Sequence, residues 1–233
     1  MSSICIANAR TRISMLIKCW YFHIGSARKM TGILIDFEGI DGSGKGTQSR
    51  LLEKELSKRE FPVALFSYPD YESEYGKIIK AFLEGKINLN PDEQFLLYLL
   101  DIAKDKEGVR QKLQNEYVVI MDRYFLSTIA YQCANQFDYE VAKEMIKLIN
   151  LSVPAIVFYL EIHPNIAQRR KNKQKGIGDR FEMDVEFLKK VINIYEKMME
   201  EHFLSTWVKL NSNDTPESIN RQILSRVEEL INR

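Results

Sequence analysis

Short apolar runs recur along the chain, and longer segments with apolar residues three or four positions apart separate them. The runs predict buried strands at residues 33–37, 63–68, 117–121, 155–160 and 207–210. The intervening spacing predicts helices at residues 48–59, 74–84 and 92–106. Strands that alternate with helices predict an α/β fold in which a parallel five-stranded sheet has helices on both faces. Ligands of such folds bind beyond the carboxyl ends of the strands.

A glycine-rich stretch joins the first predicted strand to the first predicted helix. Its sequence fits GxxxxGK, the loop that cradles phosphates: Gly39-Ile40-Asp41-Gly42-Ser43-Gly44-Lys45, followed by Gly46 and Thr47. Glycines let backbone amides approach an anion, the helix N-terminus adds partial positive charge, and a lysine reaches the terminal phosphates. The motif predicts a nucleoside triphosphate site at residues 39–47 and a three-layer P-loop fold. A flexible glycine turn is the alternative.

The residue after the loop lysine departs from the motif. A serine or threonine hydroxyl usually binds Mg²⁺ there, and this chain has Gly46 followed by Thr47. Mg²⁺ would then be held by triphosphate oxygens, waters and an acidic side chain. Asp122, directly after the strand predicted at 117–121, is the candidate, with a helix cap as its alternative role.

Charge and cysteine content narrow the class of protein. Lys and Arg total 33 against 32 Asp and Glu, and residues 1–29 hold five of the basic residues and no acidic one, so the remainder has a net charge of −4. A nearly neutral body argues against a dedicated nucleic-acid binder but permits a local basic patch. The three cysteines lack metal-site and CxxC spacing, which favours a reduced intracellular setting.

The N-terminal segment is expected to lie outside the main domain. Its apolar part, residues 13–27, is interrupted by Lys18 and is too short to cross a bilayer, so we expect no membrane anchor. A transit peptide is an alternative, but an extension at residues 1–29, or a start codon assigned too early, is favoured. One domain is then expected at residues 30–233.

Further motifs produce a resemblance to a known family. They are Tyr68-Pro69-Asp70 with Glu74-x-Gly76-Lys77, Asp122-Arg123-Tyr124-x-x-Ser127-x-x-Ala130-Tyr131-Gln132, and Asp179-Arg180-Phe181-Glu182. With the phosphate loop, they resemble the thymidylate kinases over about residues 32–230. The DRYxxSxxAYQ motif is the specific piece, because many families share the loop. The resemblance implies a cytoplasmic homodimer that uses Mg²⁺ and ATP to convert dTMP to dTDP in dTTP synthesis.

The same resemblance implies roles for individual residues. Lys45 and Arg123 would be catalytic, with Arg123 touching both the acceptor phosphate and the transferred group. The residues implied for dTMP are Asp41 at the 3′-hydroxyl, Tyr131 where a ribose 2′-hydroxyl would lie, Tyr98 stacked on thymine, and Tyr68, Pro69, Arg123, Ser127 and Gln132 around the base or phosphate. A surface ion pair for Arg123 and core packing for Tyr98 are the plainer alternatives.

A basic stretch, QRRKNKQKGIGDR at residues 168–180, lies in a predicted lid at 168–182 that would close on ATP. Thymidylate kinases keep a catalytic arginine either in the phosphate loop or in the lid. Gly42 holds the loop position here, so the resemblance assigns this function to the lid, with Arg169 and Arg170 as catalytic candidates and Arg180 as a phosphate ligand. An exposed basic loop is the alternative.

Two positions depart from the family pattern on the acceptor side. Tyr71 and Ile102 stand where the family usually has arginines for the acceptor phosphate and the thymine carbonyl. Lys77, Lys104 and Lys106 are possible substitutes, although lysine cannot form a bidentate contact. The alternative is a kinase for another deoxynucleoside monophosphate or a deoxynucleoside. A P-loop GTPase or ATPase switch is less favoured because no NKxD motif is present, and retention of Lys45, Asp122 and Arg123 argues against a non-catalytic module.

Overall fold

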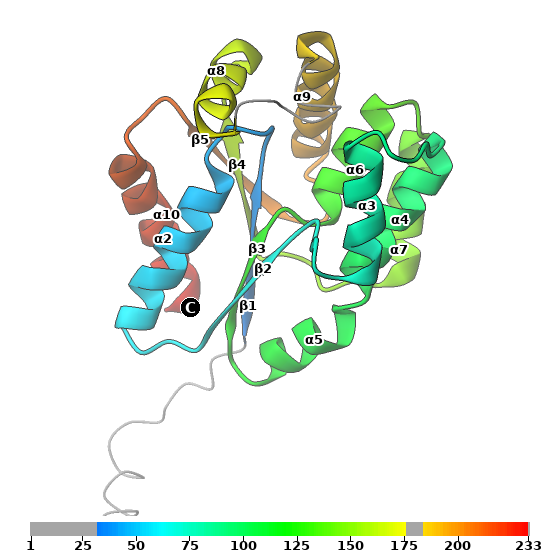
Figure 1. Cartoon of the computed structure of the whole chain (residues 1–233). Helices are drawn as coiled ribbons and strands as arrows, with labels where there is room; N and C mark the ends of the chain where they lie inside the picture. The colour runs from blue at the N-terminus through cyan, green and yellow to red at the C-terminus, as the bar shows by residue number, and fades with distance from the viewer. Residues whose placement is uncertain (1–31, 176–183, 233) are drawn as a thin grey trace, which may run out of the picture. The chain divides into compact units, whose positions relative to one another are not determined.

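The computed structural model describes residues 32–175 and 184–232, which are built around one parallel sheet (Figure 1). Its strand order is β2-β3-β1-β4-β5. The strands are β1 (Ile33–Glu38), β2 (Val63–Ser67), β3 (Val118–Asp122), β4 (Ile156–Glu161) and β5 (Thr206–Asn211). The five predicted strands and the α/β class are therefore confirmed. The extension predicted at 1–29 and lid residues 176–182, with Arg180, lie outside the described residues.

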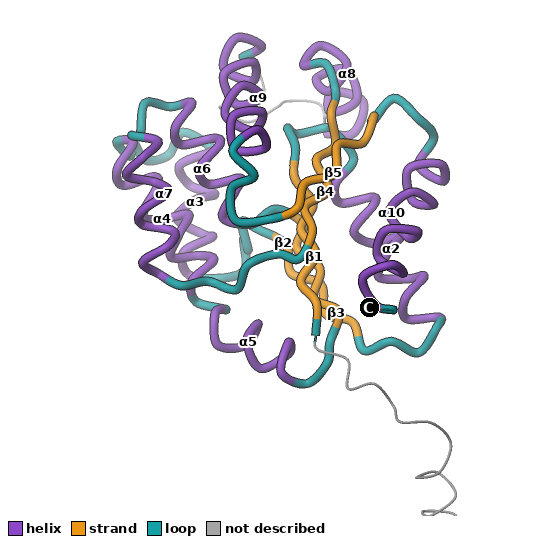
Figure 2. The backbone as a smooth tube through the Cα atoms, turned by 180° about the vertical axis from the view of Figure 1, so that it is seen from behind, coloured by secondary structure: helices purple, strands orange, loops and turns teal. Residues whose placement is uncertain are grey.

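Helices cover both faces of the sheet (Figures 1 and 2). One face carries α2 (Lys45–Lys58) and α10 (Pro216–Ile231). The other carries α3 (Glu74–Leu83), α4 (Pro91–Ala103), α6 (Phe125–Ala134), α7 (Tyr139–Ile149) and α9 (Val185–Glu200). At opposite ends of the sheet lie α5 (Lys106–Gln114) and α8 (Pro164–Lys175), the latter at the end where β4 finishes. No helix in the described part of the chain is long and apolar enough to cross a membrane.

The apolar runs become strands because the sheet buries them on both faces. Successive side chains of β1 alternate: Ile35 and Phe37 pack into the core under α2 and α10, whereas Leu34 joins the core on the opposite face. The parallel register sets Ile35 beside Ile120 of β3 and Ile156 of β4. The carboxyl ends of β1 and β3 consequently meet at one edge, where the phosphate loop begins.

Three helical segments differ from the sequence-based expectation. Helix α2 begins at Lys45 rather than at residue 48, because Gly44 caps it in a left-handed conformation with φ 99°. The helix predicted at 92–106 divides into α4 and α5, and at the break Asp105 accepts hydrogen bonds from Tyr68 and Lys104. Residues 168–175 of the predicted lid form the second half of α8.

Two carboxyl groups lie buried on one face of the central strand. Asp36 and Glu38 are two residues apart on β1, and both are 0 % exposed. Glu38 accepts hydrogen bonds from the amides of Tyr124 and Ser127 and from the hydroxyls of Ser127 and Tyr195. Neither oxygen of Asp36 accepts a side-chain hydrogen bond in the described chain, and the carboxyl group shares a hydrogen bond with Glu38 only in its protonated form. Burial, with Glu38 and Asp122 nearby, raises the pKa of Asp36 well above its usual value, so Asp36 carries the proton.

We expect Asp36→Val to stabilise the fold at neutral pH by about 1–3 kcal/mol, because it removes a buried carboxyl group to which no side chain donates and which lies beside the acidic Glu38. Unfolded Asp36 ionises near pH 4, whereas folded Asp36 keeps its proton to a higher pH. The folded state then binds the extra proton, so this group makes wild-type stability fall as pH rises above about 4. Urea unfolding at pH 5 and pH 8 should show a larger gain at pH 8.

The control for this prediction is Asp36→Asn, which cannot ionise but still buries unpaired polar atoms. It should lose the pH-dependent part of the difference without the full gain in the free energy of unfolding. An equal gain at both pH values for Asp36→Val, or a loss of stability, would contradict a protonated Asp36 to which no side chain donates.

Candidate active site

A cavity of about 930 Å³ opens at the carboxyl ends of the strands. Its volume is near the upper end of the ~300–1,000 Å³ usual for ligand cavities. Of the predicted site residues it brings together Asp41, Gly42, Ser43, Gly44, Lys45, Gly46, Thr47, Tyr68, Pro69, Tyr98, Asp122, Arg123, Ser127, Tyr131, Gln132 and Arg170. Gly39, Ile40 and Arg169 are not among the lining residues. The carbonyl oxygens of Gly39 and Ile40 instead accept hydrogen bonds from Arg123 and Lys45.

The backbone of the phosphate loop needs glycine at two positions for different reasons. Gly44 has φ 99°, and the space for a β-carbon there is nearly open, so its requirement is conformational. Gly42 has φ 81°, and a β-carbon would lie 2.4 Å from the carbonyl oxygen of Ala167 in α8. Helix α8 therefore packs directly on the loop at Gly42. An arginine at this position would collide with α8, which explains why the loop itself provides none.

Lys45 lies buried in the loop beneath the cavity. Its ammonium donates to the carbonyl of Ile40 at 2.9 Å, and the residue is 5 % exposed. Burial and the positive charge of Arg123 lower the pKa of Lys45 to about 8, against the opposing effect of Asp41, Asp122 and Glu38. An anion above the loop would favour the charged form, so the lysine is placed to gain from binding phosphate.

Nucleotide affinity is expected to fall as pH rises above about 8, because Lys45 must be protonated to bind a phosphate and its pKa in the free protein is about 8. Well above that pH, the dissociation constant for ADP should rise about tenfold per pH unit, and below it the constant should be level. Calorimetry between pH 6.5 and pH 9.5 measures this. Lys45→Arg, which stays charged, should flatten the profile; an unchanged slope in that variant would assign the titration to another group.

Arg123 connects the phosphate loop to α6. Its guanidinium pairs with Asp41 at 2.8 Å and donates to the carbonyl of Gly39 at 3.3 Å and the hydroxyl of Ser127 at 3.1 Å. The guanidinium also lies over the ring of Tyr131, 5.1 Å from its centre. Its backbone has φ 70°, and its amide donates to Phe37 of β1. Arg123 is thus fixed by several contacts rather than being a surface ion pair.

Asp41 is the acidic centre of this group of cations. Burial alone would raise the pKa of Asp41, but Arg123, Lys45 and Lys171 hold it well below its usual range. The ammonium of Lys171, on α8, lies 3.5 Å from the carboxylate. The hydroxyl of Tyr131 donates to the same carboxylate at 3.2 Å. Asp41 therefore remains ionised and ties the phosphate loop to both α6 and α8.

The lid arginines differ in position. Arg170 lines the cavity, and its guanidinium donates to the carbonyl of Ser212 after β5 at 2.9 Å. Arg169 is exposed and does not line the cavity. In this conformation, Arg170 is therefore better placed than its neighbour to reach a nucleotide.

The part of the cavity that α4 lines has fewer basic side chains than the part that the phosphate loop lines. Tyr98 and Ile102 line it from α4, and Tyr71 lines it from the loop after β2. Tyr98 is only partly buried, so it is a wall of the cavity rather than a member of the closed core. Gln132 is 1 % exposed, and neither its amide nitrogen nor its oxygen has a partner in the described chain. These atoms can hydrogen-bond to a ligand, whereas Ser127 is held by Glu38 and Arg123.

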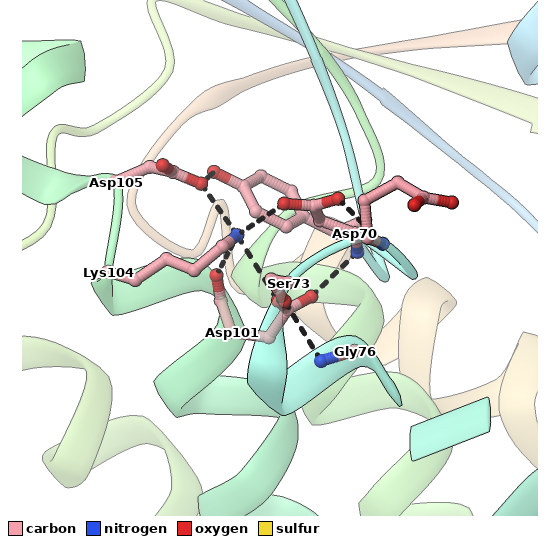
Figure 3. A network of polar contacts seen from close by, with 8 residues as sticks. Asp70, Ser73, Gly76, Asp101, Lys104 and Asp105 are labelled. Carbon is pink, nitrogen blue, oxygen red and sulfur yellow. Dashed lines mark hydrogen bonds and ion pairs between the residues drawn. The ribbon is translucent and has the colours of Figure 1, made fainter. Parts of the chain in front are cut away.

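The three lysines considered as substitutes for the missing arginines are held elsewhere. Figure 3 shows the ammonium of Lys104 among the carboxylates of Asp70, Asp101 and Asp105, at 3.2, 3.1 and 2.8 Å. Lys77 pairs with Glu74, and Lys106 donates to the carbonyl of Ile149. None of the three is among the residues that line this cavity. The part of the cavity beside α4 therefore presents aromatic, apolar and amide groups and the carboxylate of Asp101, but none of these three lysines.

The residues beside Gly46 provide only part of what a magnesium site needs. Asp122 ends β3, lines the cavity, and has an oxygen 2.9 Å from the place of a β-carbon on Gly46. Gly46 itself offers no hydroxyl. Within the described ranges, no cluster of three His, Cys, Asp or Glu side chains suits a metal. A metal here would take ligands from Asp122, phosphate oxygens and water.

Several contributors to the site were not singled out from the sequence. Glu38 follows the first apolar run directly, and its position before the loop is the only local signal. Lys171 was included only in the basic stretch, and Tyr195 of α9 carries no signal because it reaches Glu38 from 157 residues away. Arg50, one turn into α2, also lines the cavity.

Comparisons with known proteins show what this chain is similar to. A family model described as thymidylate kinase matches residues 37–223. A curated thymidylate kinase of Leptospira interrogans is 36 % identical over 72 % of this chain and 81 % of its own length. One from Arabidopsis thaliana is 33 % identical over 85 % and 72 %, and a probable thymidylate kinase of Archaeoglobus fulgidus is 31 % identical over 86 % and 97 %.

A solved structure of thymidylate kinase from Candida albicans has a similar fold. It aligns with a TM-score of 0.69 at 24 % identity, covering 85 % of this chain and 92 % of the other.

Proposed function

Because the chain belongs to the thymidylate kinase family, we propose that it transfers the γ-phosphoryl group of ATP to dTMP, giving ADP and dTDP for dTTP synthesis. The observation that carries the proposal is the convergence of Lys45, Arg123 and Arg170 in one cavity. Phosphoryl transfer needs two polyanions aligned and their charge neutralised, and such cations suit that need.

The acceptor oxygen needs no general base. A phosphate monoester has its second pKa near 6, so the dTMP phosphate is mostly a dianion at pH 7. The protein's task is therefore to hold two phosphates in line and to balance their charge. Arg123 contacts the acceptor phosphate and the transferred group, while Lys45 and the backbone amides of residues 42–47 hold the donor. Arg170, on α8, supplies the lid arginine.

The deoxyribose and base are recognised by the other end of the cavity. Asp41 accepts a hydrogen bond from the 3′-hydroxyl. Tyr131 fills the space that a ribose 2′-hydroxyl would occupy, so the cavity selects deoxynucleotides. Tyr98 stacks on the base, and the unpaired amide of Gln132 hydrogen-bonds to its edge. Ile102 does not replace the arginine that usually binds the thymine carbonyl, so base selection rests on shape and one amide.

Mg²⁺ is part of the proposal as the partner of ATP. Asp122 would hold it together with phosphate oxygens and water, since Gly46 lacks the usual hydroxyl. When bound, the ion supplies positive charge between the donor phosphates. This chain would fix the position of the ion through Asp122, at the carboxyl end of β3.

A cytoplasmic homodimer formed through helices is carried over from the family as part of the proposal. Exposed apolar side chains on α3 and α4 support this contact surface: Ile78, Leu96 and Leu100 are 44 %, 47 % and 48 % exposed. Leu96→Glu should shift sedimentation toward the monomer, with the exposed Leu148→Glu on α7 as a control. A dimer that tolerates Leu96→Glu would place the contact elsewhere.

An acceptor panel tests the proposed reaction. ADP release, coupled to NADH oxidation, is measured with dTMP, dUMP, dGMP, dCMP, UMP, CMP, AMP and thymidine. We expect dTMP to have the highest kcat/KM. Because a methyl group provides about 1–3 kcal/mol of discrimination, dUMP should follow at roughly 10- to 200-fold lower efficiency. Preference for another deoxynucleotide or for thymidine would support the alternative kinase, and hydrolysis without any acceptor would favour an ATPase.

A further inference from the structure

An arginine side chain reaches the place that Gly46 leaves vacant in the phosphate loop. A β-carbon at position 46 would lie 2.9 Å from Nη2 of Arg50 and 2.9 Å from Oδ2 of Asp122. In the standard motif, the side chain at this position places a hydroxyl on the metal ion beside the phosphates. Here a guanidinium nitrogen and a carboxylate oxygen lie beside that position instead.

Local contacts orient Arg50 without neutralising it. Its Nε donates to the carbonyl of Gly46, one turn earlier in α2, at 2.8 Å. No acidic side chain in the described chain pairs with it, whereas Arg59, Arg110 and Arg226 each pair with a glutamate. Arg50 also lines the cavity that contains Lys45 and Asp122. The terminal nitrogens of Arg50 can therefore donate hydrogen bonds to a ligand in the part of the cavity that the phosphate loop lines.

The chemistry of this position favours a phosphate as the ligand of Arg50. A guanidinium has a fork of donors that matches phosphate oxygens, and it remains charged at all physiological pH values. The preceding turn provides backbone amides and the N-terminus of α2, which both favour an anion. The carboxylate of Asp122 lies at the same distance from the vacant place, so Arg50 would be the cation and Asp122 the candidate metal ligand beside a bound phosphate.

We propose that Arg50 binds the terminal phosphates of the donor nucleotide and takes the place of the missing hydroxyl at position 46. This inference rests on the proposed function, since it concerns the same ATP site. A hydroxyl contributes mainly through the metal it holds, but a guanidinium contributes charge by itself. Arg50 should therefore matter most when the metal is absent.

Calorimetric titration with ADP, in EDTA and in excess Mg²⁺, tests the inference on the full chain. Arg50→Gln should weaken ADP binding at least about tenfold in EDTA, because it removes charged hydrogen bonds. In Mg²⁺ the loss should be smaller, since the ion neutralises the same oxygens. Arg50→Lys should lie between the two, because lysine keeps the charge without the fork. In steady-state assays, Arg50→Gln should raise the KM for ATP while the KM for dTMP stays level.

The matched control is Arg226→Gln, an exposed arginine on α10 outside the cavity. It should leave ADP affinity unchanged under both conditions. Equal ADP affinities of wild type and Arg50→Gln in EDTA would overturn the role of Arg50 while leaving the proposed function intact. A well-folded wild-type protein that binds no ADP in either condition would overturn both. Thermal melting of each variant verifies folding, which the exposed position of Arg50 should preserve.

Discussion

Arg123→Ala is expected to lower kcat by about 10³-fold or more while the protein remains folded. An arginine that neutralises the transferred group contributes about 10³ to 10⁵ in rate in enzymes of this chemistry. Arg123 is suited to this because Asp41, Gly39 and Ser127 fix its guanidinium before any substrate binds. Preorganised charge of this kind needs no rearrangement when the reaction occurs.

The expected loss lies mainly in kcat, because the charge on the transferred group develops during the reaction. Single-turnover measurement with saturating ATP and dTMP separates this effect from substrate binding. Arg123→Lys keeps the charge but loses the fork, and Lys cannot contact Asp41, Gly39 and Ser127 together. It should recover only a small part of the rate. Near-normal turnover of Arg123→Ala would remove Arg123 from the reaction.

Arg226→Ala is a matched control for the loss of one arginine. Arg226 pairs with Glu229 at 3.3 Å on the surface of α10 and is not among the residues that line the cavity. Exposed pairs of this type contribute about 0–1 kcal/mol. Its turnover and thermal melting should match wild type, so a fall in both variants would indicate general damage rather than chemistry.

The strands and the phosphate loop could be predicted from the sequence because their signals are local. A parallel strand that is buried on both faces needs a continuous apolar run, and Val118 to Met121 form such a run. The loop motif likewise fixes a turn and a lysine within seven residues, although the helix after it begins three residues earlier than predicted. The break between α4 and α5 was missed because long-range contacts hold it: the hydroxyl of Tyr68 binds Asp105 from 37 residues away.

The sequence predicted residues that line the cavity more readily than the contacts that side chains make with one another. Arg123 and Asp41 belong to motifs whose chemistry is specific to phosphates and sugars. Glu38 and Tyr195 meet across 157 residues, and neither local spacing nor composition connects them. Arg50 was overlooked for a different reason: on a helix, an arginine one turn after the loop has the same pattern as a solvated face.

Glu38 provides a cap that no local pattern reveals. Helix α6 begins after Tyr124, which makes no side-chain cap of its own. Its first amides, from Tyr124 and Ser127, donate to the carboxylate of Glu38 at 3.1 and 3.0 Å, although Glu38 lies 86 residues earlier on β1. A carboxylate at a helix N-terminus also gains from the helix dipole. The strand therefore fixes the start of the helix that follows Arg123.

Glu38→Ala is accordingly expected to lower the free energy of unfolding by about 2–4 kcal/mol, from an unsatisfied buried donor and a cavity. The change leaves the buried amide of Tyr124 without its acceptor and removes one of two partners from the Ser127 amide and the Tyr195 hydroxyl, and it leaves a cavity. Glu38→Gln should lower the free energy of unfolding by less, because its amide oxygen still accepts hydrogen bonds although its NH₂ group faces other donors. Urea unfolding measures each value, and ADP-release assays below the transition should show reduced kcat because Arg123 loses its support from Ser127.

Asp36→Val is the matched comparison for this result, because it removes a carboxyl group from the same face of β1 at the same 0 % exposure. The two substitutions should change stability in opposite directions, since Glu38 has four donors and Asp36 has none. Burial of a carboxyl group alone therefore does not determine its effect on stability; the hydrogen bonds that it accepts do. A loss of less than about 1 kcal/mol for Glu38→Ala would contradict this capping role and separate Glu38 from the positioning of Arg123.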